Sequence, residues 1–288
     1  MTKLGVSLSF FAVSLAKDSL LRLCGRKQKG SCVILYYHSI PPDQRRRFAS
    51  QLDVMLRHAT SVSLSERVTL QPGIRYVGIT FDDGFENFAE IALPELIKRR
   101  MPSTVFVIAD AVGKAFGPLG QSERVMSSDQ LKDLPTDFVT IGSHTSSHPF
   151  LPSLSEEEAR REISHSRKQI ESILNRTVQL FSFPFGGFNK TLIQICQESG
   201  YKRMFTTLPM LAFENPEEVV TGRVRVDPTD WPLEFWLKLA GAYRWLPRAF
   251  ALKRRLLENG VARWILRREL AVDASSGRRS IIQEAGNS

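Results

Sequence analysis

The 288-residue sequence has little cysteine and no apolar run long enough to cross a bilayer. Its three cysteines are an odd number without a Cys-x-x-Cys pair, which argues against a disulfide framework and a thiolate zinc site. Cys32 and Cys196 lie in apolar stretches, so we predict buried thiols there. Low-complexity segments and sequence repeats are also lacking. With 42% hydrophobic and 24% charged residues, the composition is typical of a globular protein.

The formal net charge of +9 is concentrated at the two ends of the chain. We therefore divide the sequence into a basic amphipathic segment (1–30), one mildly acidic folded domain (31–235) and a basic amphipathic helical extension (236–288). The ends are expected to pack on the domain or to touch an anionic membrane surface peripherally. No nucleic-acid partner is expected, because no recognised nucleic-acid-reading motif accompanies the charge.

The apolar run 5–16 is too short to span a bilayer, which takes about 20 residues. Leucines continue the apolar pattern after it between lysines and arginines, which favours one amphipathic helix. The alternative is a signal peptide ending at Ala16. The helix predicts a cytoplasmic protein or one peripheral to the inner membrane, and the signal peptide predicts a secreted or periplasmic one.

Short apolar runs alternate with helical patterns across the central domain. Seven strands are predicted, at 32–38, 76–81, 104–109, 138–144, 179–185, 203–207 and 223–227. The longest helix between them begins with Ser155 and Glu158, the spacing of a capping box. This alternation predicts an α/β fold, a distorted (β/α) barrel of about seven parallel strands, with a doubly wound sheet as the alternative.

Polar residues follow five of these strands, and the carboxyl ends of parallel strands converge on one face. His38, the pair Asp82-Asp83, the sequence His144-Thr-Ser-Ser-His148, Phe185 in a Pro-Phe-Gly-Gly turn, and Asp227 with Asp230 are expected there. Two histidines and one aspartate suit Zn²⁺ or a similar ion and leave a position for water. The histidine pair reaches one ion if its segment turns helically. Of two adjacent aspartates, one is expected to bind metal and the other to stay free as a base.

Four motifs resemble those of the polysaccharide deacetylases, the family 4 carbohydrate esterases: TFDDGF (80–85), HTSSH (144–148), FSFPFG (181–186) and DPTDW (227–231). The resemblance implies a metal-dependent hydrolase that removes acetyl groups, usually N-acetyl, from an oligo- or polysaccharide. It implies Asp82 as general base and Asp83, His144 and His148 as metal ligands. It also implies that the backbone N–H of Phe185 stabilises the oxyanion. Zn²⁺ is the expected metal, and Co²⁺, Ni²⁺ and Mn²⁺ also fit this ligand set.

The sequence departs from the family pattern at two places. Ser182 stands where the third motif usually has an arginine that steadies the base, and the late histidine that acts as general acid is missing. We expect His38 to supply that acid from the first strand, with a structural histidine as the alternative. Asp227 and Asp230 would normally orient the missing group. A metal-containing sugar-binding or scaffold barrel without catalysis is the second functional hypothesis.

Overall fold

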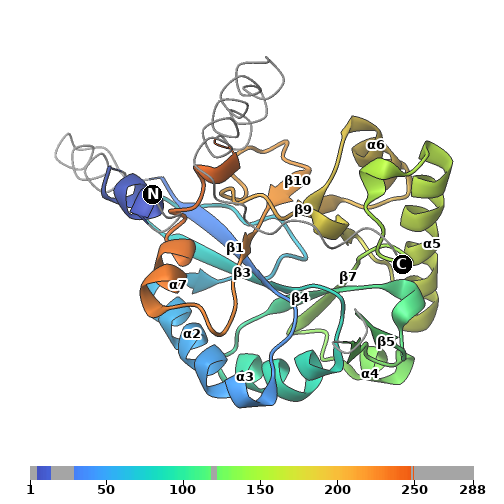
Figure 1. Ribbon diagram of the computed structural model, residues 1–288, viewed down its shortest axis with the longest axis horizontal. Helices are drawn as coiled ribbons and strands as arrows, with labels where there is room; N and C mark the ends of the chain where they lie inside the picture. The colour runs from blue at the N-terminus through green and yellow to red at the C-terminus, as the bar shows by residue number, and fades with distance from the viewer. Residues whose placement is uncertain (1–4, 14–28, 118–121, 248, 250–288) are drawn as a thin grey trace, which may run out of the picture. The chain divides into compact units, whose positions relative to one another are not determined.

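Nine parallel strands form one sheet, nearly closed into a barrel, in the computed structural model (Figure 1). Eight of them follow the order β10-β9-β8-β7-β4-β3-β1-β11, and β2 pairs with β3 outside this path. Their bounds are β1 (Ser31–Tyr37), β2 (Thr60–Ser61), β3 (Arg75–Phe81), β4 (Ser103–Val107), β7 (Val139–Ser143), β8 (Leu180–Ser182), β9 (Arg203–Thr206), β10 (Val220–Gly222) and β11 (Val224–Arg225). The predicted (β/α) barrel is confirmed.

The closure of the sheet differs from the sequence prediction. The segment 223–227, predicted as one strand, contains only the two-residue β11, and β10 ends just before it. These two strands occupy opposite ends of the strand order, with Arg223 alone between them in the chain. One residue therefore joins the two edges of the sheet. The alternation of apolar residues in 223–227 predicts a strand, but it does not show that the chain passes here from one edge of the sheet to the other.

Helices cover the outer surface of the sheet (Figure 1). They are α2 (Arg45–His58), a π-helical turn (Phe88–Ala92) leading into α3 (Leu93–Lys98), α4 (Ser128–Asp133), α5 (Glu156–Leu174), α6 (Lys190–Glu198) and α7 (Pro232–Leu239). The predicted capping box opens α5: Ser155 accepts from the Glu158 N–H, and the Glu158 side chain accepts from the Ser155 N–H. Short strands β5 (Ala115–Phe116) and β6 (Glu123–Arg124) form a separate antiparallel ribbon.

The core has two layers because both faces of the sheet are buried. On β1, Val33, Leu35 and Tyr37 belong to the larger apolar cluster shared with the helices, whereas Cys32 and Ile34 belong to a smaller one. This alternation follows from the two-residue repeat of a strand. Residues of the second set are accordingly placed on the barrel interior. The predicted burial of the Cys32 and Cys196 thiols is confirmed.

The structure describes residues 5–13, 29–117, 122–247 and 249. Cys24 and most of the predicted C-terminal extension lie outside these residues. One compact unit extends to Trp245, and a second one comprises 246–288. No helix in the described ranges is long and apolar enough to cross a membrane.

Residues 5–13 form a helix, as the amphipathic pattern predicts, and this helix packs on the protein. Ser7 is buried, and its hydroxyl accepts a hydrogen bond of 3.0 Å from the Trp245 indole. Phe11 packs edge-on against Trp236 of α7, with ring centroids 4.6 Å apart. Packing is therefore the observed role of this part of the basic N-terminal segment, while membrane contact stays a prediction.

Replacing Phe48 of α2 by alanine should lower the free energy of unfolding by about 3–5 kcal/mol, because a fully buried ring leaves a cavity. Its ring packs edge-on against Tyr37 and Phe81, at centroid distances of 5.3 and 6.1 Å. Urea unfolding measures the change. Leu56→Ala on the same helix is the control, since Leu56 is 45% exposed and should change stability by less than about 0.5 kcal/mol. Equal losses in both variants would contradict this packing.

Candidate metal centre and active site

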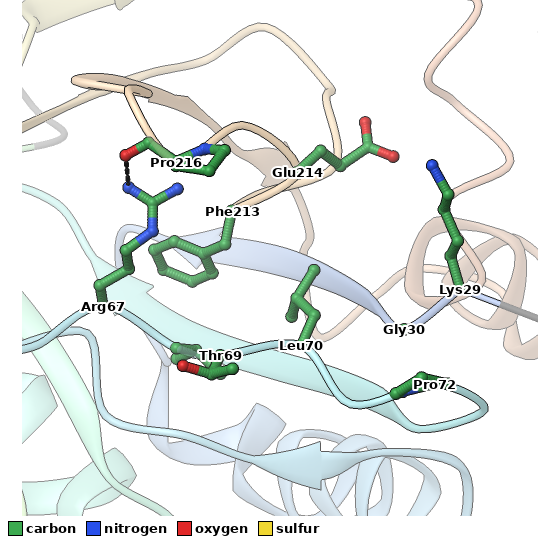
Figure 2. A pocket seen from close by; sticks show the side chains of 10 residues that line it. Lys29, Gly30, Arg67, Thr69, Leu70, Pro72, Phe213, Glu214 and Pro216 are labelled. Atoms are coloured by element: carbon green, nitrogen blue, oxygen red, sulfur yellow. Dashed lines mark hydrogen bonds between the residues drawn. The ribbon is translucent and has the colours of Figure 1, made fainter.

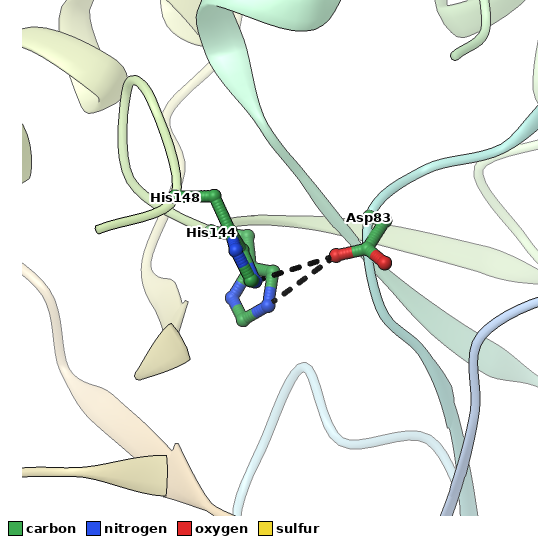
Figure 3. A group of neighbouring side chains, drawn as sticks. All are labelled: Asp83, His144 and His148. Atoms are coloured by element: carbon green, nitrogen blue, oxygen red, sulfur yellow. Dashed lines mark ion pairs between the residues drawn. The ribbon is translucent and has the colours of Figure 1, made fainter. Parts of the chain in front are cut away.

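Asp83, His144 and His148 come together at the carboxyl ends of β3 and β7 (Figure 3). The Asp83 Oδ1 atom lies 3.6 Å from the Nε2 atom of each histidine. Both dashed lines in Figure 3 converge on this oxygen. Asp83 and His144 are buried, and His148 is partly buried. The structure thus brings together the three residues that the sequence suggested as metal ligands.

A tight loop, and not a helical turn, brings the two histidines together. Thr145 and His148 both have left-handed backbones, with φ of 67° and 64°. The Thr145 hydroxyl donates to the His144 carbonyl and accepts from the His148 N–H at 3.0 Å. The histidines therefore meet without the helical turn that was the expected condition, because the threonine side chain supplies a local alternative to helical hydrogen bonds.

Glu162 of α5 holds this loop, and the sequence analysis did not identify it. One carboxylate oxygen accepts from the N–H groups of Ser146 and Ser147 at 3.0 and 2.9 Å. The other accepts from the Ser147 hydroxyl at 2.8 Å. On the far side, the His144 Nδ1 atom lies 2.8 Å from the Ser182 carbonyl oxygen, which orients the ring so that Nε2 faces Asp83. No short motif links Glu162 to the histidines, so only the folded chain reveals its role.

The electrostatics of the three residues fit a divalent cation. Burial, with a smaller contribution from Asp82, raises the pKa of Asp83 to about 7, and Glu123 adds to the effect. Burial lowers the pKa of His144 to about 3 and keeps its imidazole neutral. The Asp83 Oδ1 atom is buried without a hydrogen-bond partner. A carboxylate oxygen that lacks a partner beside two neutral imidazoles is the donor set of a Zn²⁺ site.

Asp82 has a different environment, although it is the next residue in the chain. Both carboxylate oxygens accept hydrogen bonds from Arg223, at 2.7 and 2.9 Å, and the arginine side chain is fully buried. Burial alone would raise the pKa of Asp82. The Arg223 guanidinium outweighs that effect, and the pKa lies below its usual range. Asp82 is therefore kept ionised, as a base requires.

Arg223 also contacts Ser182, the residue that stands where the third motif usually has an arginine. Its guanidinium donates to the Ser182 hydroxyl at 2.7 Å and to the Thr80 hydroxyl at 3.0 Å. It also lies over the rings of Tyr36 and Phe106, 4.8 and 5.1 Å from their centroids. The arginine that contacts Asp82 therefore comes from the junction of β10 and β11 and not from the third motif. The sequence analysis missed this residue, and the alternation in Arg-Val-Arg-Val-Asp was its only signal.

His38 follows β1 and belongs to the same group of charges. Burial lowers the pKa of His38, and Arg225 and Arg223 add to the effect, while Asp82 and Asp227 oppose it. Its ring packs edge-on against Tyr36 at a centroid distance of 5.6 Å. The other histidines lie elsewhere, with His58 at the end of α2 and His165 exposed on α5. Of the three histidines outside the Asp83 cluster, His38 is therefore the one that lies among the charges around Asp82.

Phe185 occupies the turn after β8, with φ of 58°. Its side chain is 65% exposed, and its ring lies 4.8 Å from that of His148. The turn is held from β9, because the Thr206 hydroxyl donates to the Gly186 carbonyl at 2.7 Å. The structure therefore places the Phe185 ring beside that of His148.

Asp227 and Asp230 stabilise a loop. The Asp230 carboxylate accepts from Lys238 of α7 at 2.8 and 2.7 Å and from the Asp227 N–H at 3.1 Å. The Asp227 carboxylate accepts from Thr229. Among the described residues neither carboxylate makes a hydrogen bond to His38, although the charge of Asp227 acts on it.

A cavity of about 410 Å³ lies at the amino ends of β1 and β3, at the opposite end of the strands from Asp83 and the two histidines (Figure 2). Gly30 and Pro72, which precede these strands, line it together with Arg67 and Phe213. Figure 2 shows Arg67 bonded to the Pro216 carbonyl oxygen, so this arginine ties two loops together. The residues expected at the carboxyl ends of the strands are not part of this cavity.

His148→Ala should weaken Zn²⁺ binding by more than about 100-fold, because losing a ligand costs more than losing an outer hydrogen-bond partner. Elemental analysis of dialysed protein and competition with a chromogenic chelator measure this change. His165→Ala is the control, since that side chain is exposed. Equal zinc content in the two variants would contradict the assignment.

Arg223→Met should lower the free energy of unfolding by about 3–5 kcal/mol, because it leaves the Asp82 carboxylate buried without its partner. Adding Asp82→Asn should recover part of this loss. Chemical denaturation of the two single variants and the double variant measures the coupling. Arg225→Met is the control, since Arg225 is exposed. Strictly additive losses would contradict a direct interaction.

Residues 70–204 match the family profile described as polysaccharide deacetylase. Among curated relatives, the Bacillus subtilis (strain 168) protein YxkH, which is named as a polysaccharide deacetylase, is 28% identical over 158 residues, covering 55% of this chain and 54% of the relative. The peptidoglycan-N-acetylmuramic acid deacetylase PdaC of the same strain is 29% identical over 133 residues, covering 46% of this chain and 26% of the relative. The chain thus spans about half the length, or less, of these relatives.

Solved structures share the fold. IcaB from Ammonifex degensii superposes with a TM-score of 0.64 at 25% identity, over 74% of this chain and 98% of that one. The Streptococcus pyogenes deacetylase PplD, in complex with acetate, has a TM-score of 0.60 at 22% identity, over 74% of this chain and 99% of that one. The matched residues 70–204 contain Asp82, Asp83 and both loop histidines. The similarity to the polysaccharide deacetylases therefore rests on this segment and on the shared fold.

Proposed function

We propose that the chain is a metal-dependent carbohydrate deacetylase that hydrolyses N-acetyl groups. The observation that carries the proposal is the contrast between two adjacent carboxylates. Asp82 is held ionised by Arg223, and Asp83 faces two imidazoles with an oxygen that lacks a partner. A protein that only bound sugar would have no need of a buried, ionised base beside a metal-capable cluster.

Asp83, His144 and His148 would hold the metal, for which Zn²⁺ is our first choice. When bound, such an ion polarises an acyl carbonyl and lowers the pKa of water. Co²⁺, Ni²⁺ and Mn²⁺ are the alternatives that two histidines and a carboxylate accept. Glu162 would keep the histidine loop in place through its bonds to Ser146 and Ser147.

Asp82 would act as the general base. Arg223 occupies one lone pair on each carboxylate oxygen, so others stay available to accept a proton from the attacking water. The ion pair also fixes the direction of the carboxylate, since two parallel N–H···O bonds leave little rotation. The water oxygen then adds to the acetyl carbon while its proton moves to Asp82.

Phe185 and His38 would complete the reaction. The first N–H groups of a short helical turn have no partner within that turn, so the Phe185 N–H can donate to the developing oxyanion. His38 would protonate the amine as the carbon–nitrogen bond breaks, which yields acetate and a free amine. Because its pKa is lowered, His38 has to take up a proton before it can give one.

We propose an acetylated oligo- or polysaccharide as the substrate. The relatives include proteins named as a peptidoglycan-N-acetylmuramic acid deacetylase and as a chitin deacetylase. Both names refer to polymers of N-acetylated sugars. This shared chemistry supports an N-acetylated sugar here.

Asp82→Asn and His38→Ala should each lower kcat for acetate release from N-acetylglucosamine oligomers by about 10²–10⁴-fold, the range for a general base or acid. His58→Ala is the control for His38, because His58 lies at the end of α2 and outside the site. Chelation of the metal should abolish release, and added Zn²⁺ should restore it.

The same measurements test the alternative of a non-catalytic sugar-binding barrel. That alternative predicts bound metal and bound glycan without acetate release from any substrate in a panel of acetylated glycans. Full activity of His38→Ala would remove His38 as the acid and leave the deacetylase proposal intact. Full activity of Asp82→Asn would overturn the assigned base.

A further inference from the structure

A second cavity of about 410 Å³ lies between α2 and the loop that leads from β11 into α7. We call it the Trp231 cavity. Its lining includes Arg47, Gln51, Pro228, Thr229 and Trp231. The mechanism proposed above makes no use of it.

The Trp231 cavity adjoins the active site on the side of His38. Tyr37, which precedes His38, donates its hydroxyl to Gln51 at 2.8 Å. Gln51 in turn donates its amide to the Asp227 carbonyl at 2.8 Å, and Pro228 on the cavity wall follows Asp227. One short series of contacts therefore runs from the catalytic strand end to the cavity. The charge of Asp227 also acts on His38, so the loop that lines the cavity lies close to the candidate acid.

Trp231 offers a flat apolar surface on a fixed backbone. Its side chain is 77% exposed. The loop beneath it is held by Asp230, which binds Lys238 and the Asp227 N–H, and by the 2.8 Å bond from the Phe235 N–H to the Trp231 carbonyl. Exposing an indole to water forgoes hydrophobic stabilisation. A fixed, exposed aromatic ring suits the apolar C–H face of a sugar ring.

Arg47 gives the cavity a positive charge that nothing in the described part of the chain neutralises. It is exposed and has no hydrogen bond or ion pair among the described residues. Asp230 is the other charged residue of the lining, and Lys238 already pairs with it. A free guanidinium binds carboxylates and phosphates with two parallel hydrogen bonds.

We infer that the Trp231 cavity is a subsite for a sugar unit that carries an anionic group, next to the acetylated unit in the active site. Trp231 stacks on the ring of that unit, and Arg47 binds its carboxylate or phosphate. The inference rests on the proposed function for the identity of the polymer, and it names that polymer as an acidic glycan.

Equilibrium binding to the zinc-loaded full chain tests the subsite, and the Asp82→Asn substitution is present in every sample to suppress turnover. The probes are an N-acetylglucosamine hexamer, a hexasaccharide of alternating glucuronic acid and N-acetylglucosamine, and an N-acetylglucosamine hexamer carrying a phosphate monoester. Calorimetric titration should give about tenfold tighter binding of one or both acidic probes than of the neutral one. The acidic probe that binds more tightly identifies the anionic group.

Arg47→Gln should remove this preference, and Arg46→Gln, the exposed neighbouring arginine, should keep it. Trp231→Ala should weaken binding of all three probes, and it leaves the fold intact because this side chain makes no capping bond to α7. Equal affinity for neutral and acidic probes, or a preference that survives in Arg47→Gln, would overturn the subsite. A preference for acidic probes in a protein that releases no acetate from any acetylated glycan would overturn the proposed activity and leave the subsite standing.

Discussion

The buried ion pair between Arg223 and Asp82 is the interaction on which the arrangement of this site depends. Removing two charges from water is costly, and only close pairing with further hydrogen bonds offsets that cost. Arg223 meets this requirement with two bonds to Asp82 and one each to Ser182 and Thr80. Because Arg223 is also the single residue between β10 and β11, the closure of the sheet and the position of the base are one structural feature.

Two adjacent aspartates acquire opposite properties through this arrangement. Asp82 is stabilised as an anion, while Asp83 has a raised pKa and an oxygen without a partner. Successive residues at a strand end point in different directions, so each reaches a different environment. The contrast between the two carboxylates therefore follows from the end of β3, and Asp83 and the two histidines together form a group that could hold a metal ion.

The rim of the barrel differs in character from this interior. Phe185 and Trp231 expose large aromatic surfaces on turns whose backbones are held by hydrogen bonds. Arg47 adds a free charge on the side of His38. The buried groups are fixed by one another. We therefore expect substitutions that change the substrate preference to lie on the rim, where a side chain can be replaced without disturbing a neighbour.

The sequence by itself determined the barrel, the capping box of α5 and the two histidines with the aspartate pair as a candidate metal site, because each depends on local periodicity or on residues beside strand ends, while the choice of Asp83 as the ligand came from the resemblance of its motif. Only the tertiary structure decided which arginine pairs with Asp82, since Arg223 lies 141 residues from Asp82 in the chain. It also decided that Glu162 holds the histidine loop and that left-handed residues shape it. Such contacts depend on how distant segments meet, and spacing along one chain carries no record of that.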